Sequence, residues 1–380
     1  MTPPVSAPAD CRPTPSETLL LRAALLRSEE GLKSWEKWQM GARRPLRAAA
    51  ARLLPAVYLN LRGLAAQEPW LETAKTEYLR ARYSNLLRFD DAAPVLRALS
   101  ARGLDFLLLK GAALILGHYG DPGHRPMVDL DILVREERAE QAIEVLGAFG
   151  YAPAAPADAP ARALVHSVPL TKIGAPPLDL HWRPFELDDA RSVWEDVEEA
   201  RLLDLPVRLP APAGLLLHAC VSGSCWDWDA QPRWILDALA VIRSSGSRLD
   251  WGRFSSRVVE LGLSPGVCDS LRFLRKEFGA TIPAEVLEEL AAAPTSVWER
   301  RAARARSVRP DLRGPILTFA LRLDEHRRLV RRGVASGGLL GLMHVWRRSW
   351  GLEHLWLLPV HAALRGGRRA WQLARHRLGA

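Results

Sequence analysis

The pattern of apolar positions divides the chain into helical and strand-like stretches. Between residues 16 and 102 the apolar residues recur at the spacing of one helix face, in stretches that begin at Leu19, Ala48 and Glu77. This spacing predicts a helical N-terminal region, 16–102. Residues 1–15 are Pro-rich and lack an apolar segment, so we expect a leader without fixed structure.

Short apolar runs replace the helical spacing after Gly103. Runs of this kind, bounded by turn formers, are typical of buried strands. The expected strands are 104–109, 127–134, 165–173 and 178–182, with helices at 112–117 and 136–149 and an Ala/Pro linker at 152–162. The order strand–helix–strand–helix–strand–strand predicts a small mixed α/β core, 103–212.

Helical spacing returns from Ala213 onward. Candidate helices are 214–222, 232–244, 251–261, 265–278 and 284–292, followed by one or two long basic helices in 296–380. We therefore expect an α+β fold, in which a small mixed-sheet core is embedded between helical N- and C-terminal regions. The helical region 213–295 and the basic region 296–380 complete the division of the chain.

Composition adds limits to this organisation. The chain has 380 residues, of which 48% are hydrophobic and 25% charged, as in ordinary globular proteins of two or three folding units. No apolar stretch reaches the roughly 18–20 residues that a membrane span needs. The four cysteines form no CxxC pair, which favours reduced thiols and a cytoplasmic protein. A zinc site from His218, Cys220 and Cys225 is a weaker alternative.

The positive charge is concentrated at one end of the chain. Residues 299–380 contain 18 Arg and no Lys against five acidic residues, whereas the whole chain carries only +9. The remainder is therefore net acidic. Such a basic segment can attract phosphate, nucleic acid or anionic lipid. A general preference for Arg over Lys in this sequence explains the segment equally well.

Carboxylates follow two of the predicted strands. Asp129 and Asp131 are two residues apart, so they share one face of their strand about 6–7 Å apart, while Leu130 and Ile132 face the core. Asp179 lies in another apolar strand, where an unpartnered carboxylate costs several kcal/mol. A shared metal ion would offset that cost, and so would a salt bridge to an arginine.

Other polar side chains near these strands suit phosphate binding. Lys110, Gly111 and Ala112 join a strand to a helix, where free backbone N–H groups and the Lys110 charge can hold a phosphate. Arg125, just before the acidic strand, can reach the same ligand. His181 shares a face with Asp179, and it can position an acceptor, act as a base or serve as a hydrogen-bonded core residue.

These motifs together resemble a known family. The strings are Phe106–Leu114 (FLLLKGAAL), His118–Asp121 (HYGD), Arg125–Val134 (RPMVDLDILV) and Asp179–Trp182 (DLHW). In this order they are similar to the uncharacterised nucleotidyltransferase family of bacteria, within the polymerase-β-like nucleotidyltransferases. The resemblance runs from residue 17 to residue 290. Ala112 stands where that superfamily usually has Ser or Gly.

The resemblance implies transfer of a nucleoside monophosphate from an NTP to an acceptor, with release of pyrophosphate. Asp129, Asp131 and Asp179 would hold two Mg²⁺ or Mn²⁺ ions, while Lys110, Gly111, Ala112 and Arg125 would bind the NTP. The acceptor remains open between a small molecule, a peptide or protein, and RNA. Two rival functions remain: a binding module that has lost catalysis, and an anionic-surface or nucleic-acid binder acting through residues 299–380.

Overall fold

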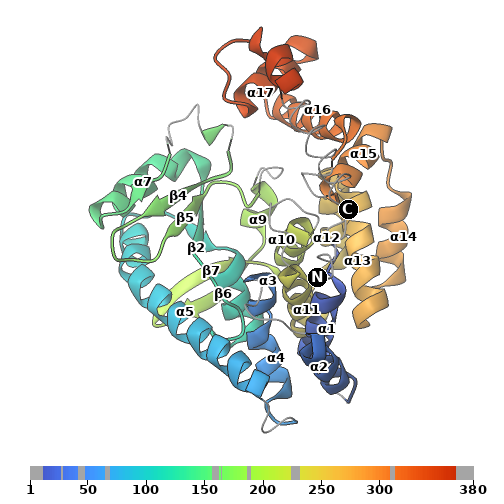
Figure 1. Cartoon of the computed structure of the whole chain (residues 1–380). Helices are drawn as coiled ribbons and strands as arrows, with labels where there is room; N and C mark the ends of the chain where they lie inside the picture. The colour runs from blue at the N-terminus through green and yellow to red at the C-terminus, as the bar shows by residue number, and fades with distance from the viewer. Residues whose placement is uncertain are drawn as a thin grey trace. The chain divides into compact units, whose positions relative to one another are not determined.

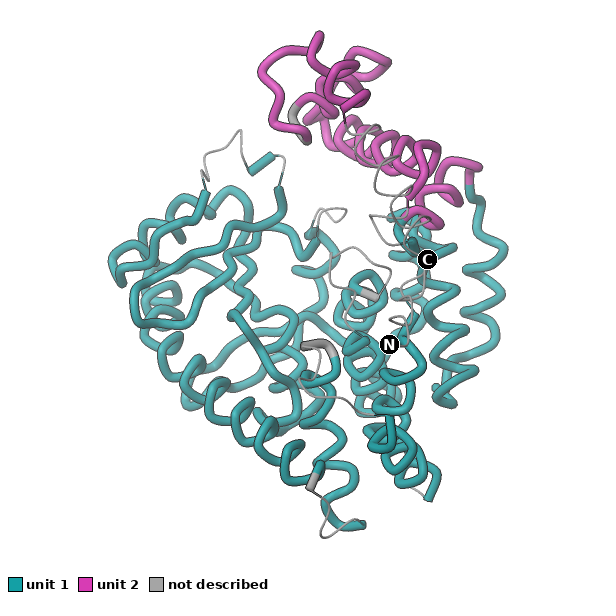
Figure 2. Tube along the Cα trace, viewed as in Figure 1, with its two compact units in different colours: residues 1–295, 306–312 teal, residues 296–305, 313–380 magenta. Residues whose placement is uncertain are grey.

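A computed structural model describes most of the chain. The described residues are 12–26, 29–41, 48–64, 69–155, 162–163, 165–185, 190–223, 232–308 and 313–364. The chain divides into two compact units, drawn in teal and magenta in Figure 2. Unit 1 comprises residues 1–295 and 306–312, and unit 2 comprises 296–305 and 313–380. The finer division into five regions stays a prediction.

The N-terminal region of unit 1 is helical. Its helices are α1 (Pro15–Leu25), α2 (Glu29–Gly41), α3 (Ala48–Ala51), α4 (Leu54–Leu61) and α5 (Pro69–Ala101). Thr14 caps α1: its hydroxyl accepts from the Glu17 backbone N–H, and the Glu17 carboxylate accepts from the Thr14 N–H. Helix α1 therefore begins inside the predicted leader, of which residues 1–11 lie outside the described residues.

The mixed sheet predicted for the core is confirmed. Its strands are β1 (Phe106–Leu108), β2 (Leu130–Val134), β3 (Ala152–Pro153), β4 (Ser167–Thr171) and β5 (Leu178–His181), in the spatial order β1-β2-β5-β4-β3. Only the β2–β5 pair is parallel. Helix α7 (Ala139–Ala148) follows β2 in the chain, precedes β3 and contacts α5 (Figure 1).

Three details of this core differ from the predictions. Strand β3 lies at the start of the predicted linker 152–162. Strand β2 begins at Leu130, so Asp129 lies in a bend before the strand. Strands β6 (Val197–Leu202) and β7 (Leu205–Pro210) form an antiparallel hairpin that the apolar pattern did not indicate. The reason is visible in β6, whose sequence VEEARL contains only one fully buried residue and has no long apolar run.

The helices that follow match the predicted ones within a few residues. They are α10 (Pro212–Gly223), α11 (Arg233–Ser245), α12 (Trp251–Glu260), α13 (Ser264–Phe278) and α14 (Ala284–Ala292). The short α9 (Arg191–Glu195) precedes the hairpin. One hydrophobic core runs through all of unit 1, from Leu20 in α1 to Leu290 in α14. The sheet therefore shares one core with helices that precede it and helices that follow it in the chain.

Unit 2 contains several helices rather than the one or two long ones predicted. Among the described residues it holds α15 (Val297–Arg306, the last residue being assigned to unit 1), α16 (Pro315–Arg331) and α17 (Gly338–Ser349). Gly and Pro residues at Gly314–Pro315 and near Gly338 interrupt the helical run. In the described part of the chain, no helix is both long and apolar enough to cross a membrane.

Candidate active site

The parallel pairing of β2 with β5 brings two predicted carboxylates side by side. Asp131 lies opposite Asp179 in the register of the two strands, and Leu133 lies opposite His181. Because side chains alternate along a strand, Asp131, Asp179 and His181 project from one face of the sheet. Leu130 and Ile132 enter the hydrophobic core on the other face. The apolar pattern of each strand therefore aims its acid away from the core.

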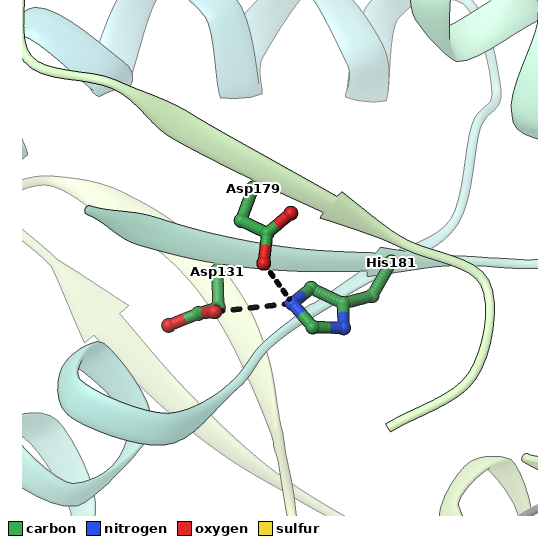
Figure 3. A group of neighbouring side chains, drawn as sticks. All are labelled: Asp131, Asp179 and His181. Atoms are coloured by element: carbon green, nitrogen blue, oxygen red, sulfur yellow. Dashed lines mark hydrogen bonds and ion pairs between the residues drawn. The ribbon is translucent and has the colours of Figure 1, made fainter. Parts of the chain in front are cut away.

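His181 connects the two carboxylates. Its Nε2 lies 3.0 Å from Asp131 Oδ1 and 2.9 Å from Asp179 Oδ2, as Figure 3 shows. Its Nδ1 lies 3.2 Å from the backbone carbonyl of Arg183, to which it can donate. Burial and the Lys110 charge lower the pKa of His181, but the hydrogen bonds to both carboxylates outweigh them and raise it. A doubly protonated ring satisfies all of these contacts.

Lys110 supplies a second cation to the same place. Its Nζ lies 2.6 Å from Asp131 Oδ1 and 3.8 Å from Asp179 Oδ2. Burial works against the charged amine, but Asp131 and Asp179 raise the pKa of Lys110, so it stays protonated. The backbone of Lys110 has a φ of 44°, in the left-handed region that costs a non-glycine residue about 1–3 kcal/mol. We call Lys110, Asp131, Asp179 and His181 the carboxylate cluster.

The carboxylate cluster fits a divalent metal ion. Asp131, Asp179 and His181 each offer one ligand atom, and these three atoms lie within 4.8 Å of one another. Asp179 Oδ1 is buried and has no hydrogen-bond partner among the described residues. A buried carboxylate oxygen without a donor is costly, and a cation would complete its coordination. The Lys110 ammonium pairs with Asp131 Oδ1, so it would compete with a metal ion for that oxygen.

Asp129 lies beside this cluster rather than within it. It is half-buried and lines the adjacent cavity, and it is not one of the three grouped metal-ligand candidates. Burial raises the pKa of Asp129, and repulsion from the Asp131 carboxylate raises it further. A cation shared with Asp131 would relieve that repulsion.

The predicted phosphate-binding residues divide between the cavity and the core. Lys110 and Gly111 line the cavity, whereas Ala112 is buried in the short helix α6 (Lys110–Leu114). Gly111 has no room for a side chain: a Cβ there would lie 2.5 Å from Met127 Sδ and would also overlap the Arg125 guanidinium. The glycine thus allows Arg125 to approach the backbone at the start of α6.

Arg125 is buried and held by an acidic partner from a distant helix. Its Nε and Nη2 donate to the two carboxylate oxygens of Asp237 in α11, at 2.9 and 3.0 Å. The Tyr119 hydroxyl donates to Asp237 Oδ1 at 2.9 Å. Burial alone would raise the pKa of Asp237, but Arg125 and Arg233 lower it. We call Arg125, Asp237 and Tyr119 the arginine cluster; its charges cancel within a bidentate pair.

A cavity of about 320 Å³ connects the two clusters. Sequence analysis named His218 only as a possible zinc ligand, and it missed the wall residues Arg52, His166 and Arg233. They come from segments far apart in the chain and carry no local motif, so no spacing could have indicated them. Burial raises the pKa of the nearby Cys220 thiol to about 12, which does not favour the zinc alternative, and Cys225 lies outside the described residues.

The fold and this site define a nucleotidyltransferase-type core. The sequence profile of the uncharacterised nucleotidyltransferase family matches residues 46–279, and the chain belongs to that family. No curated protein matches the chain.

Two solved structures are similar at low identity. The solution structure of the antibiotic-resistance factor ANT(2'')-Ia is 17% identical over 47% of this chain and 96% of that one, with a TM-score of 0.36. An antigenic nucleotidyltransferase-like protein from Paracoccidioides brasiliensis is 14% identical over 56% of this chain and 95% of that one, with a TM-score of 0.34.

Proposed function

We propose that this protein transfers a nucleoside monophosphate from an NTP to an acceptor and releases pyrophosphate. The observation that carries the proposal is the in-register pair Asp131 and Asp179, in which Asp179 has a buried oxygen without a partner among the described residues. Asp131 lines a cavity whose wall also includes Lys110 and three arginines. Membership of a nucleotidyltransferase family supports the same reaction.

In this reaction an acceptor oxygen forms a bond to the α-phosphorus while the bond from that phosphorus to the bridging oxygen of pyrophosphate breaks. The acceptor gives up its proton to a base or to water. Asp129, Asp131 and Asp179 would hold Mg²⁺ or Mn²⁺, and such ions supply charge neutralisation and lower the pKa of the acceptor hydroxyl. The binding of two ions is part of this proposal, and Asp129 would contribute a ligand from the cavity wall.

Lys110 and His181 have distinct roles in the proposal. The Lys110 ammonium forms an ion pair with Asp131. If a metal ion took its place there, the ammonium would be free to bind the phosphates. Both ring nitrogens of His181 are engaged by protein groups, and its side chain is fully buried. His181 therefore acts as a positioning residue that fixes the two carboxylates rather than as the base.

The rival functions have weaker support. Ala112, in place of Ser or Gly, is buried and does not line the cavity, so its missing hydroxyl removes no group from the described cavity wall. In unit 2, part of the arginine charge is already paired: Arg328 with Asp324 at 2.8 Å and Arg322 with Glu325 at 2.6 Å. A binding role for residues 299–380 would add to transfer rather than replace it.

Calorimetric titration tests the proposed function directly. ATP, GTP, CTP and UTP are titrated into the full chain with and without Mg²⁺, beside the Asp131→Asn variant. The expected result is Mg²⁺-dependent binding of at least one nucleotide that the variant loses while its circular dichroism spectrum is unchanged. Equal binding by the wild type and the variant, or no binding of any nucleotide, would contradict the proposal.

A further inference from the structure

The two ends of the cavity differ in charge. Asp129 and Asp131 line the cavity where Lys110 pairs with Asp131. At the other end the lining groups are Arg52, Arg125, Arg233 and Asp237. The first end therefore carries net negative charge and the second net positive charge. A ligand that combines a divalent cation with a chain of phosphates complements both ends at once.

Arg125 cannot be the source of the free positive charge. Its side chain is buried, and Asp237 neutralises it through two hydrogen bonds. Its remaining nitrogen, Nη1, lies against Gly111. Arg125 thus connects the start of α6 to the arginine end and leaves little capacity for a ligand.

The positive charge of Arg233, in contrast, is not neutralised by an ion pair with the described residues. Its Nη1 donates to the backbone carbonyl of Pro126 at 3.0 Å, and in the described part of the chain no carboxylate lies within ion-pair distance of it. Burial lowers the pKa of Arg233 to about 10, with further lowering by Arg125 and Arg52 that Asp237 only partly offsets. A half-buried guanidinium near two other arginines and one carboxylate that is already paired favours a bound anion.

Three further features of the same wall favour an anion. Arg52 lines the cavity and forms no ion pair or hydrogen bond with the described residues. Arg233 is the first residue of the 13-residue helix α11, whose N-terminus carries partial positive charge. The indole N–H of Trp234 is buried without a partner among the described residues, and Trp234 also lines the cavity.

We propose that Arg52 and Arg233 bind the terminal phosphate of the nucleotide and thereby make the protein select a triphosphate. This assignment rests on the proposed function. Along the wall, Lys110 and Gly111 border the carboxylates, Arg125 follows against Gly111, and Arg233 follows against Pro126. A phosphate chain that starts at the carboxylate cluster would therefore end at Arg233 and Arg52.

The guanidinium fork suits this role. Arginine donates two parallel hydrogen bonds to a phosphate, and Arg233 retains Nε and Nη2 after its bond to Pro126. Arg52 needs no rearrangement of existing ion pairs to join it. Selection would arise because a diphosphate leaves these two cations without a counter-charge, whereas a triphosphate provides one.

The test compares the affinities of an NTP and the corresponding NDP, each with Mg²⁺, by calorimetry on the full chain. The variants are Arg52→Gln, Arg233→Gln and Arg233→Lys, with Arg97→Gln as the control at an exposed arginine outside the cavity. Arg52→Gln removes no hydrogen bond or ion pair with the described residues, so it should fold even if Arg233→Gln does not. Circular dichroism and thermal melting identify any variant that fails to fold.

The wild type and Arg97→Gln should bind the NTP at least about tenfold more tightly than the NDP. In Arg52→Gln and Arg233→Gln this preference should shrink towards unity through weaker NTP binding, and Arg233→Lys should retain part of it. If the wild type binds the NTP but the preference survives in both glutamine variants, the inference fails while the proposed function stands. If both variants keep the preference yet lose turnover, the arginines serve an anionic acceptor, which also overturns the inference. Absence of any nucleotide binding by the wild type overturns both.

Discussion

The carboxylate cluster and the arginine cluster are both buried assemblies of opposite charges, yet they differ in completeness. In the arginine cluster Asp237 accepts three hydrogen bonds, and Arg125 meets it with a bidentate fork. In the carboxylate cluster Asp179 has an oxygen without a partner among the described residues, and the balancing cations are His181 and a lysine whose side chain is 30% exposed. The complete cluster is suited to hold the fold together, and the incomplete one is suited to exchange its cation for a ligand.

The largest effect expected from this difference is on catalysis. Asp179→Asn should reduce turnover by a factor on the order of 10³ or more, because several kcal/mol of transition-state stabilisation depend on the charge of the carboxylates. Stability should change little. The matched control is Ser167→Ala, which removes only the hydroxyl 3.3 Å from Asp179 Oδ2 and should keep nearly full activity. Steady-state kinetics on both variants would refute the assignment if Asp179→Asn kept wild-type turnover.

The arginine cluster should show the reverse behaviour. Asp237→Asn leaves the Arg125 charge buried without a counter-charge, so the free energy of unfolding should fall by about 3–5 kcal/mol. Urea denaturation measures this loss. As a control, Asp204→Asn removes an exposed partner of Arg97 and should cost no more than about 1 kcal/mol. Equal losses in the two variants would mean that the arginine cluster is not a structural element.

A smaller effect tests whether Lys110 holds the place of a metal ion. Lys110→Met removes the ammonium that competes for Asp131, so the affinity for Mg²⁺ alone should rise about tenfold, or about 1.4 kcal/mol. Without metal the variant should melt at a lower temperature, since His181 is then the only cation paired with the two carboxylates among the described residues, and Mg²⁺ should restore the melting temperature. Calorimetry that finds unchanged or weaker Mg²⁺ binding would contradict the exchange.

The smallest expected effect is the loss of stability in mild acid. Buried histidines, rather than the two clusters, should cause it. Burial lowers the pKa of His118 to about 4 and that of His218 to about 3, below the unfolded value of about 6.5. Between these values the unfolded chain binds more protons, so stability should fall as the pH drops from about 6.5 to about 4. The melting temperature should decrease by several degrees over this range.

A histidine variant separates this response from that of the carboxylates. His118→Gln should melt with a weaker dependence on pH in the same range, because it removes one of the groups that titrate there. Interactions lower the pKa values of Asp131, Asp179 and Asp237 despite their burial, so their ion pairs should persist until more acidic pH. An unchanged pH dependence in His118→Gln would show that another group controls the acid response.

Much of the fold could be predicted from the apolar pattern. The strands β1, β2, β4 and β5 and the helices α10 to α14 are observed close to their predicted ranges, because buried strands and amphipathic helices leave short or periodic apolar runs. The hairpin β6–β7 was missed because it is largely exposed on one side and rich in charged residues. The basic C-terminal region contains more helix breaks than its composition indicated.

The candidate site could be predicted only in part. Asp131 became a candidate because its spacing from Asp129 predicts a shared strand face, and Asp179 because an acid inside an apolar strand is costly without a partner. The π-helical turn Ile115–Tyr119, which carries Tyr119 towards Asp237, gave no signal in the sequence. Arg52 and Arg233 gave none either, since a single arginine on a helical segment is ordinary.

By itself the sequence determined which residues must enter the core, which strands carry acids, and which face of each strand those acids occupy. These properties follow from local periodicity and from the cost of burying charge. The tertiary structure decided that β2 and β5 pair in parallel with Asp131 opposite Asp179, that Lys110 lies between them, and that Asp237 neutralises Arg125 from 112 residues away. Such pairings depend on how distant segments pack, and short-range patterns carry no information about them.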